Sequence, residues 1–261
     1  MAVKLTILGS GSNGNASYVE TDETRLLIDV GFSGRQIRQR LAALARVPEN
    51  LTAILITHEH SDHISGLAAI AEKARIPVYC NRATMEEIVR ITEGAKLDFR
   101  LFVAGGGFEV GDISVETFSI PHDAQDPVGF VLHTNGSSIG FATDLGHVTK
   151  LVLERIRKTN ALVLESNHDV RMLQDCPHRP WSLKQRILSR HGHLSNEAAA
   201  DCVSEIMSGD LQHLYLGHLS RDCNKPELAQ RVMSQRLQTL GAAHVQLHVT
   251  SQNTASPTLT L

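Results

Sequence analysis

The stretch AILITHEHSDH, residues 53–63, joins a short apolar run to a cluster of histidines and acids. The apolar run predicts a buried strand that ends at the cluster. In an extended chain, residues two apart point the same way, so His58 and His60 can share one metal ion. A helix predicted to begin at residue 64 turns the chain and carries Asp62 and His63 to a neighbouring position. Imidazole and carboxylate ligands suit zinc, manganese or iron rather than calcium, so this stretch predicts two adjacent metal sites.

Apolar runs rich in Val, Ile and Leu alternate with amphipathic stretches on both sides of this cluster. The runs predict strands at 3–8, 17–20, 25–28, 53–56, 78–80, 113–118, 129–132, 138–142, 161–164, 213–216 and 245–249. The amphipathic stretches predict helices at 36–45, 64–74, 83–91, 151–158, 181–190, 196–207 and 226–240. Asn135-Gly136 predicts a two-residue hairpin turn, because Asn-Gly suits positive φ angles. Helices outside packed sheets account for this order, so we expect one α/β domain over residues 1–261.

The composition points toward metal chemistry and away from several other classes of protein. Histidine occurs 14 times in 261 residues, against 25 Lys plus Arg, and histidine is the commonest metal ligand. The formal net charge of −3 indicates that any binding to nucleic acid would be local rather than by bulk charge. No apolar run approaches the ~18 residues of a membrane-spanning helix, and a turn-rich GSGSNGN interrupts residues 1–21, unlike a secretory signal. Four scattered Cys without a CxxC pair predict reduced thiols, so we expect a cytoplasmic protein with no membrane partner.

The HxHxDH pattern after an apolar strand resembles the metallo-β-lactamase fold, a four-layer αββα sandwich that carries a dinuclear metal site. Further landmarks follow in the family's order: Asp29 in LIDVG, His122 in IPHDA, Asp144 in FATDLG and His218 in LGHLS. Taken singly, each has a simpler interpretation as a turn aspartate or a surface histidine. Their joint order and spacing favour the resemblance.

The resemblance implies a role for each of these residues. The first metal would take His58, His60 and His122, and the second Asp62, His63 and His218, with Asp144 shared. Asp29 would support the metal-binding loop. Two divalent ions, zinc or manganese with iron also suitable, would then activate a water and stabilise the oxyanion formed on attack.

A second motif, His193-Leu194-Ser195-Asn196-Glu197-Ala198-Ala199, resembles an element of the ribonuclease Z-like phosphodiesterases. In that group the histidine lies across from the metals and protonates the leaving oxygen. The resemblance thus implies Asp62 and His193 as catalytic residues, with Ser195 near a helix N-terminus that favours phosphate. A loop histidine without chemistry is the simpler interpretation of His193.

Almost the whole chain resembles the YycJ/VicX/WalJ-like group of small bacterial nucleases. The motifs that carry this resemblance are GSGSNGN at 9–15, LIDVG, HEHSDH, PHDA, ESNHD at 165–169, GHLSN at 192–196 and GHLSR at 217–221. Members of the group are regarded as metal-dependent exonucleases that act on the 5′ end of DNA.

Other polar residues are candidates for contacts with substrate. Ser12 and Asn13 lie in the glycine-rich loop, although such loops between strands are mostly turns. His168 follows the strand predicted at 161–164, in a segment that is equally well a helix-capping loop. A basic segment between residues 171 and 190 contains the sole tryptophan, Trp181, which could stack on an unpaired base. Its candidate phosphate contacts are Arg179, Lys184, Arg186 and Arg190. A solvated helix face is the simpler interpretation.

These observations predict a dinuclear metal-dependent phosphodiesterase, specifically a 5′→3′ DNA exonuclease that uses a metal-activated water. Nucleic acid, and DNA in particular, is the expected partner. The alternative is a small-molecule hydrolase of the same fold: a cyclic phosphodiesterase, or less readily a thioesterase or lactonase. The His193 motif and the basic segment argue against a thioesterase or lactonase but do not separate a nuclease from a cyclic phosphodiesterase.

Overall fold

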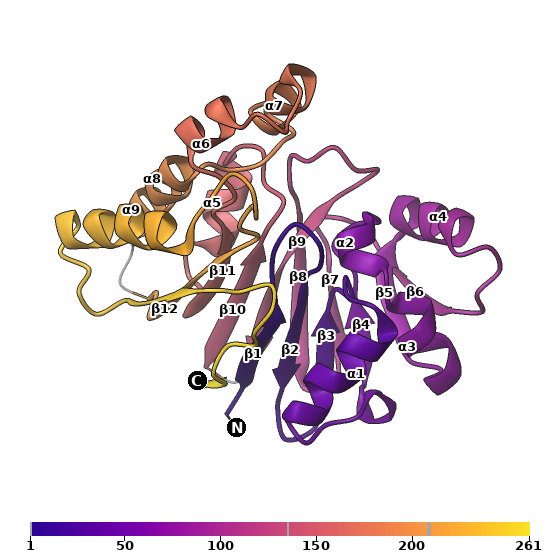
Figure 1. Cartoon of the computed structure of the whole chain (residues 1–261). Coiled ribbons are helices and arrows are strands. Elements are labelled where there is room, and N and C mark those ends of the chain that lie inside the picture. The colour runs from indigo at the N-terminus through magenta and orange to yellow at the C-terminus, as the bar shows by residue number, and fades with distance from the viewer. Residues whose placement is uncertain (1, 135, 208–209) are drawn as a thin grey trace.

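The structure is a computed structural model that describes residues 2–134, 136–207 and 210–261. Six strands of the first half and the last strand of the chain build one seven-stranded sheet, in the order β14-β1-β2-β3-β4-β5-β6 (Figure 1). The bounds are β1 Lys4–Gly9, β2 Ala16–Glu20, β3 Arg25–Ile28, β4 Ala53–Leu55, β5 Pro77–Asn81, β6 Asp98–Phe102 and β14 Leu259–Thr260. Pairing is antiparallel from β14 to β3 and parallel from β3 to β6.

The second sheet repeats this plan, in the order β13-β12-β11-β10-β9-β8-β7. The bounds are β7 Gly107–Val110, β8 Ile113–Ser119, β9 Val128–Thr134, β10 Ser137–Ala142, β11 Ala161–Glu165, β12 His213–Gly217 and β13 Gln246–Val249. Pairing is antiparallel from β7 to β10 and parallel from β10 to β13. The predicted hairpin is confirmed by the pairing of Thr134 with Ser137, while Asn135 of its turn lies outside the described residues.

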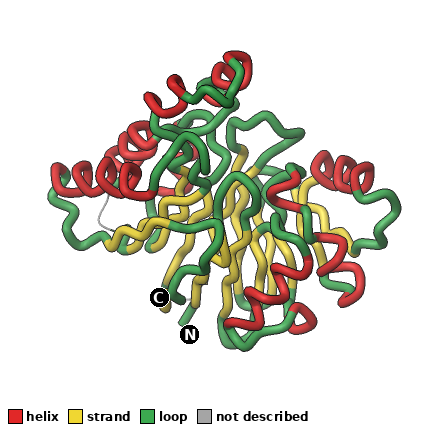
Figure 2. Tube along the Cα trace, in the orientation of Figure 1, coloured by secondary structure: helices red, strands yellow, loops and turns green. Residues whose placement is uncertain are grey.

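Helices cover the outer faces of both sheets, as Figure 2 shows. Near the first sheet lie α1 Gly34–Ala43, α2 Ser61–Ile64, α3 Leu67–Ala74 and α4 Arg82–Ile91. The second sheet is flanked by α5 Lys150–Ile156, α8 Asn196–Ile206 and α9 Pro226–Thr239, and α6 Val170–Asp175 and α7 Trp181–Ile187 project beyond its end.

Three apolar cores separate these layers. Leu5 and Ile28 of the first sheet pack with Phe130 and Tyr215 of the second in the central core. A second core lies between the first sheet and its helices, and a third between the second sheet and α5, α8 and α9. Burial of apolar surface on both faces of each sheet accounts for the continuous apolar strands. The predicted four-layer αββα sandwich is confirmed.

Several element boundaries differ from the sequence-based prediction. The helix predicted at 64–74 is two helices, α2 and α3, separated at Gly66. A Cβ on Gly66 would lie 2.2 Å from the Phe32 carbonyl oxygen, so a close backbone approach fixes this break. Asp62 therefore lies inside α2 rather than before a helix. The helix predicted at 181–190 ends at Ile187, and β6, β7, β14 and α6 had no predicted counterpart.

Candidate metal centre and substrate cleft

Loops at one end of the two sheets bring the candidate residues together, at the end away from both chain termini in Figure 1. Asp29 follows β3, the HEHSDH loop follows β4, and Asp144 and His218 follow β10 and β12. Asp29, Asp144 and His218 have φ angles of 61°, 57° and 56°. Such left-handed conformations are uncommon outside glycine, and here they turn the chain sharply as each strand ends.

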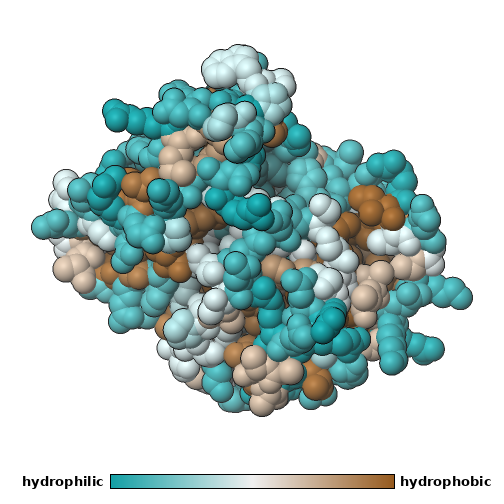
Figure 3. Space-filling model, viewed as in Figure 1, coloured by the Kyte–Doolittle hydropathy of each residue, from teal (hydrophilic) through white to brown (hydrophobic). Residues whose placement is uncertain are grey.

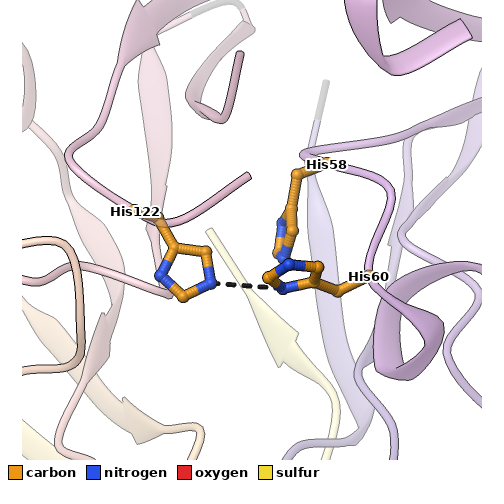
Figure 4. Close-up of side chains that lie close together, drawn as sticks. All are labelled: His58, His60 and His122. Atoms are coloured by element: carbon orange, nitrogen blue, oxygen red, sulfur yellow. Dashed lines mark hydrogen bonds between the residues drawn. The ribbon is translucent and has the colours of Figure 1, made fainter. Parts of the chain in front are cut away.

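The first cluster consists of His58, His60 and His122, whose ring nitrogens approach a common point (Figure 4). His122 Nε2 lies 3.3 Å from His60 Nδ1. Two ligand atoms, each ~2.1 Å from one tetrahedral ion, are themselves roughly 3.4 Å apart. The spacing therefore suits a shared metal ion, and His122 Nδ1 is held separately by the Gly192 carbonyl oxygen, 3.2 Å away.

The second cluster consists of Asp62, His63 and His218. Asp62 Oδ2 lies 3.3 Å from His218 Nε2 and 3.6 Å from His63 Nε2, again near the separation expected around one ion. Asp144 lies between the clusters, with Oδ2 at 3.2 Å from His63 Nε2 and Oδ1 at 3.7 Å from His122 Nε2. This placement suits a carboxylate that serves two ions.

Hydrogen bonds behind the clusters orient the histidine rings. Asp29 Oδ2 lies 2.8 Å from His63 Nδ1, and Asp29 Oδ1 accepts the Thr57 backbone N–H at 2.9 Å. The Thr57 hydroxyl lies 3.0 Å from His58 Nδ1. These contacts leave Nε2 of His63 and of His58 directed toward the clusters, as a ligand requires. Asp29 thus contacts both His63 and Thr57, the residue just before the HEHSDH loop.

A carboxylate that the sequence analysis did not single out, Glu165, organises the other side of the site. Its Oε1 accepts hydrogen bonds from Nδ1 of His193 at 2.8 Å and Nδ1 of His218 at 2.7 Å. Its Oε2 accepts the backbone N–H groups of Leu145 and Leu194. These distances are too short for two ligands of one ion, so Glu165 acts as a hydrogen-bond acceptor here. The feature of the sequence that could have identified Glu165 is a single acidic residue at the end of an apolar strand.

The charges of this site depend on one another. Burial raises the pKa of Glu165, but His193 and His218 outweigh it and lower that pKa to about 2. Burial opposes a charge on His58 and holds its pKa well below the usual value, so its ring is neutral. A neutral imidazole and ionised carboxylates are the protonation states that metal binding needs.

Among the described residues, two buried atoms of the clusters lack hydrogen-bond partners: His58 Nε2 and Asp144 Oδ2. Leaving such atoms unsatisfied is costly, and a cation between them would satisfy both. The donor set of imidazole nitrogens and carboxylate oxygens therefore fits divalent metal ions.

An open cleft of about 180 Å³ lies over the clusters. Its lining includes Ser12, His193, Arg179 and Arg186, together with Asp123 and Asn167. Because Glu165 holds His193 Nδ1, Nε2 of the same ring is left for the cleft. The surface at this end is largely hydrophilic in Figure 3.

Other predicted contacts with substrate are not brought to the cleft. Lys184 is buried and its ammonium group donates to the Gln174 carbonyl oxygen at 2.6 Å, so it does not belong to an exposed basic face. Arg190 instead bonds to His147 at 2.8 Å. Asn13 is exposed outside the cleft lining. The sequence places these residues in one basic segment, but it does not show which of their side chains face the cleft.

Ser195 and His168 also do not line the cleft, and their contacts are with the surrounding fold. The Ser195 hydroxyl caps α8 by accepting the Ala198 N–H at 3.1 Å. His168 is buried, and burial lowers its pKa to about 4. Neither of its ring nitrogens has a hydrogen-bond partner within residues 2–134, 136–207 and 210–261. Asp169 caps α6, which agrees with the helix-capping interpretation of that loop.

Residues 24–218 match the family described as "Beta-lactamase superfamily domain". Structures with the same fold include the metallo-β-lactamase fold protein YhfI from Bacillus subtilis, with a TM-score of 0.75 at 14% identity over 100% of this chain and 99% of that one. The short form of human tRNase Z gives a TM-score of 0.66 at 18% identity over 97% and 98%. The chain belongs to the metallo-β-lactamase superfamily.

Within that superfamily, the chain is similar to bacterial proteins named as exodeoxyribonucleases. It is 40% identical to exodeoxyribonuclease YycJ of Bacillus anthracis over 92% of this chain and 91% of that protein. It is 38% identical to exodeoxyribonuclease WalJ of Streptococcus pneumoniae over 97% and 96%. The predicted resemblance to this group is confirmed. No helix in the described ranges is long and apolar enough to cross a membrane.

Proposed function

We propose that this protein is a dinuclear metal-dependent exonuclease that hydrolyses phosphodiester bonds of DNA in the 5′→3′ direction. The observation that carries the proposal is 38–40% identity to proteins named exodeoxyribonucleases over more than nine-tenths of the chain. We further propose that it acts in the cytoplasm, in keeping with four buried free cysteines.

His58, His60 and His122 would hold one divalent ion, and Asp62, His63 and His218 the other, with Asp144 shared. Zinc or manganese suits these ligands, and iron does as well. Bound there, such ions supply a water of lowered pKa and stabilise the charge that develops on the phosphate. Asp29 and Glu165 keep the histidine rings oriented for this task.

Proton transfer to the leaving oxygen falls to His193 in this proposal. Burial opposes a charge on its ring, but the Glu165 carboxylate outweighs burial and raises the pKa of His193. The raised pKa favours the protonated ring, which a general acid requires. Asp62 contributes to catalysis through its place beside His63 and His218.

The test uses the metal-loaded protein with end-labelled single- and double-stranded DNA and RNA, and with bis-p-nitrophenyl phosphate. We expect stepwise release of nucleotides from 5′-labelled DNA. Hydrolysis of bis-p-nitrophenyl phosphate without loss of any DNA label would reject the nuclease and favour a small-molecule phosphodiesterase. Label retained at the 5′ end while the 3′ end shortens would reject the proposed polarity.

A further inference from the structure

Two arginines on the cleft wall contributed by residues 170–187 are each paired with an acid. Arg186 bonds through Nε to Asp123 Oδ2. Arg179 Nη2 lies 3.3 Å from Asp222 Oδ2. Both arginines line the cleft that contains the metal-ligand candidates. Neither pair has a part in holding the metal ions or in the proton transfer described above.

Both guanidinium groups keep donors to spare. The Arg186 side chain is 59% exposed, and among the described residues its Nη groups have no partner. Arg179 Nε is buried, and no residue in the described part of the chain accepts a hydrogen bond from it. A guanidinium has five N–H donors in a fixed planar fork that matches phosphate oxygens. These two side chains are therefore only partly satisfied by their acids.

Asp123 places Arg186 close to the metal-ligand clusters. Its Oδ1 lies 3.4 Å from His122 Nε2, while Oδ2 accepts the bond from Arg186. The pair of Asp123 with the Arg186 guanidinium is an ion pair between a carboxylate and a cation. Only the Asp123 carboxylate thus separates Arg186 from His122, a candidate metal ligand. If the metal ions bind one phosphate of a strand, the next phosphate of that strand can lie at Arg186.

We propose that Arg179 and Arg186 form a second phosphate site, for the phosphate next to the scissile one in a nucleic-acid strand. Asp123 and Asp222 hold the two arginines in place when the cleft is free and compete with that phosphate. The inference rests on the proposed nuclease function, and it adds that the site prefers a polymeric substrate over a small one. A strand gains the second contact, whereas a small diester with a single phosphate does not.

The first test compares Arg186→Ala with Arg190→Ala, two charge losses four residues apart. Arg190 bonds to His147 and does not line the cleft, so it is the matched control. We expect Arg186→Ala to raise KM for a DNA oligonucleotide about 10- to 100-fold, the range for a lost bond between charged groups. The loss on bis-p-nitrophenyl phosphate should be smaller, and metal content should match the wild type. Equal KM values for the two variants would overturn the proposal.

A double-mutant cycle tests the competition by Asp123. Asp123→Asn removes the competing charge and should lower KM for DNA several-fold, but only while Arg186 is present. The same change of KM in the Arg186→Ala background would overturn the competition, because Asp123 would then act by another route. Metal analysis of each variant guards against an effect through His122.

Binding without turnover separates this proposal from the exonuclease assignment. A fluorescent single-stranded oligonucleotide with phosphorothioate linkages serves as the probe. For single strands log K falls with log[salt] by ~0.7 per phosphate contacted, so the Arg179→Ala/Arg186→Ala variant, which loses the contact with one phosphate, should flatten the slope by roughly 0.7. A flattened slope with no DNA hydrolysis would keep the phosphate site and reject the nuclease. Hydrolysis with an unchanged slope would reject the phosphate site alone.

Discussion

Asp144 lies between the two histidine groups, within 3.2 Å of His63 and 3.7 Å of His122. Burial raises the pKa of this carboxyl, but His218 and His63 outweigh burial and hold it well below the usual range. Its negative charge therefore persists in a fully buried position, where a charge is costly unless cations surround it. A single residue of this kind couples the two proposed metal sites.

We expect Asp144→Ala to remove both metal ions, because the bridging carboxylate contributes to each, and to abolish activity. His58→Ala should chiefly weaken one ion, since His58 groups with His60 and His122. Elemental analysis of the purified variants measures the metal content per chain. An Asp144→Ala protein that retains two ions and full activity would rule out the bridging assignment.

In His193, Nδ1 is held by Glu165 and the ring lines the cleft. We expect His193→Ala to keep its metal content while the chemical step on DNA slows by ~10²–10⁴-fold. The loss should be much smaller with bis-p-nitrophenyl phosphate, because p-nitrophenolate leaves without a proton. Equal losses on both substrates would show that His193 serves structure or binding instead.

At the scale of elements, the position of α2 depends on a backbone contact with the loop after β3. The Asn15 and Gly31 backbones bond to each other, and Asn15 N–H donates to the Asp62 carbonyl oxygen at 2.8 Å. A Cβ on Gly31 would lie 1.6 Å from that same carbonyl oxygen. Only glycine allows α2 to approach so closely, and α2 carries Asp62 and His63.

We therefore expect Gly31→Ala to displace α2, to weaken metal binding by at least tenfold and to lower the melting temperature. Gly106→Ala is the control, because its Cβ would meet one atom, the Val103 carbonyl oxygen, at 3.1 Å. Metal titration and thermal unfolding of both variants measure the effect. Normal metal affinity in Gly31→Ala would show that α2 is held by other contacts.

The same local geometry explains which elements could be predicted from the sequence. The run at 53–63 predicted both a strand and a metal loop because β4 is buried on both faces and ends at the loop. The break at Gly66 could not be predicted, since it results from contact with Phe32, distant in sequence. Strand β6 was missed because an edge strand that exposes Asp98 and Arg100 lacks the apolar run of a buried one.

At the scale of the whole molecule, the site is built from residues that both sheets contribute. The HEHSDH loop belongs to the first sheet, whereas His122, Asp144 and His218 follow strands of the second. The order of the motifs along the chain predicted that these residues would lie together, as they do, and their assignment as metal ligands stays a prediction. The direction of each arginine and the contacts of Glu165 could not be predicted, because they depend on packing between distant segments. The prediction of one domain over residues 1–261 stays a prediction.

Because the proposed ligands come from both sheets, metal ions should stabilise the whole fold. A ligand at 100 times its Kd adds about 2.7 kcal/mol to stability, and each kcal/mol shifts the melting temperature of a chain this size by roughly 2–4 °C. We expect a chelator to lower the melting temperature by about 5–10 °C. Asp144→Ala, which lacks the ions in either case, should show no such drop.

The decrease in melting temperature that a chelator causes should become larger as pH rises from 6 to 8.5. In the metal-free protein, burial opposes charge on His63 and His218, but Asp144 outweighs burial and raises the pKa of both histidines well above the usual value. A raised pKa gives stability that is complete below the unfolded value, ~6.5, and is lost as pH rises toward the folded one. Metal ions compete with protons for the same histidines, so their binding strengthens over this range. Thermal unfolding at several pH values, with and without chelator, measures the difference between the two melting temperatures. A difference that becomes smaller as pH rises would contradict the assignment of these histidines as ligands.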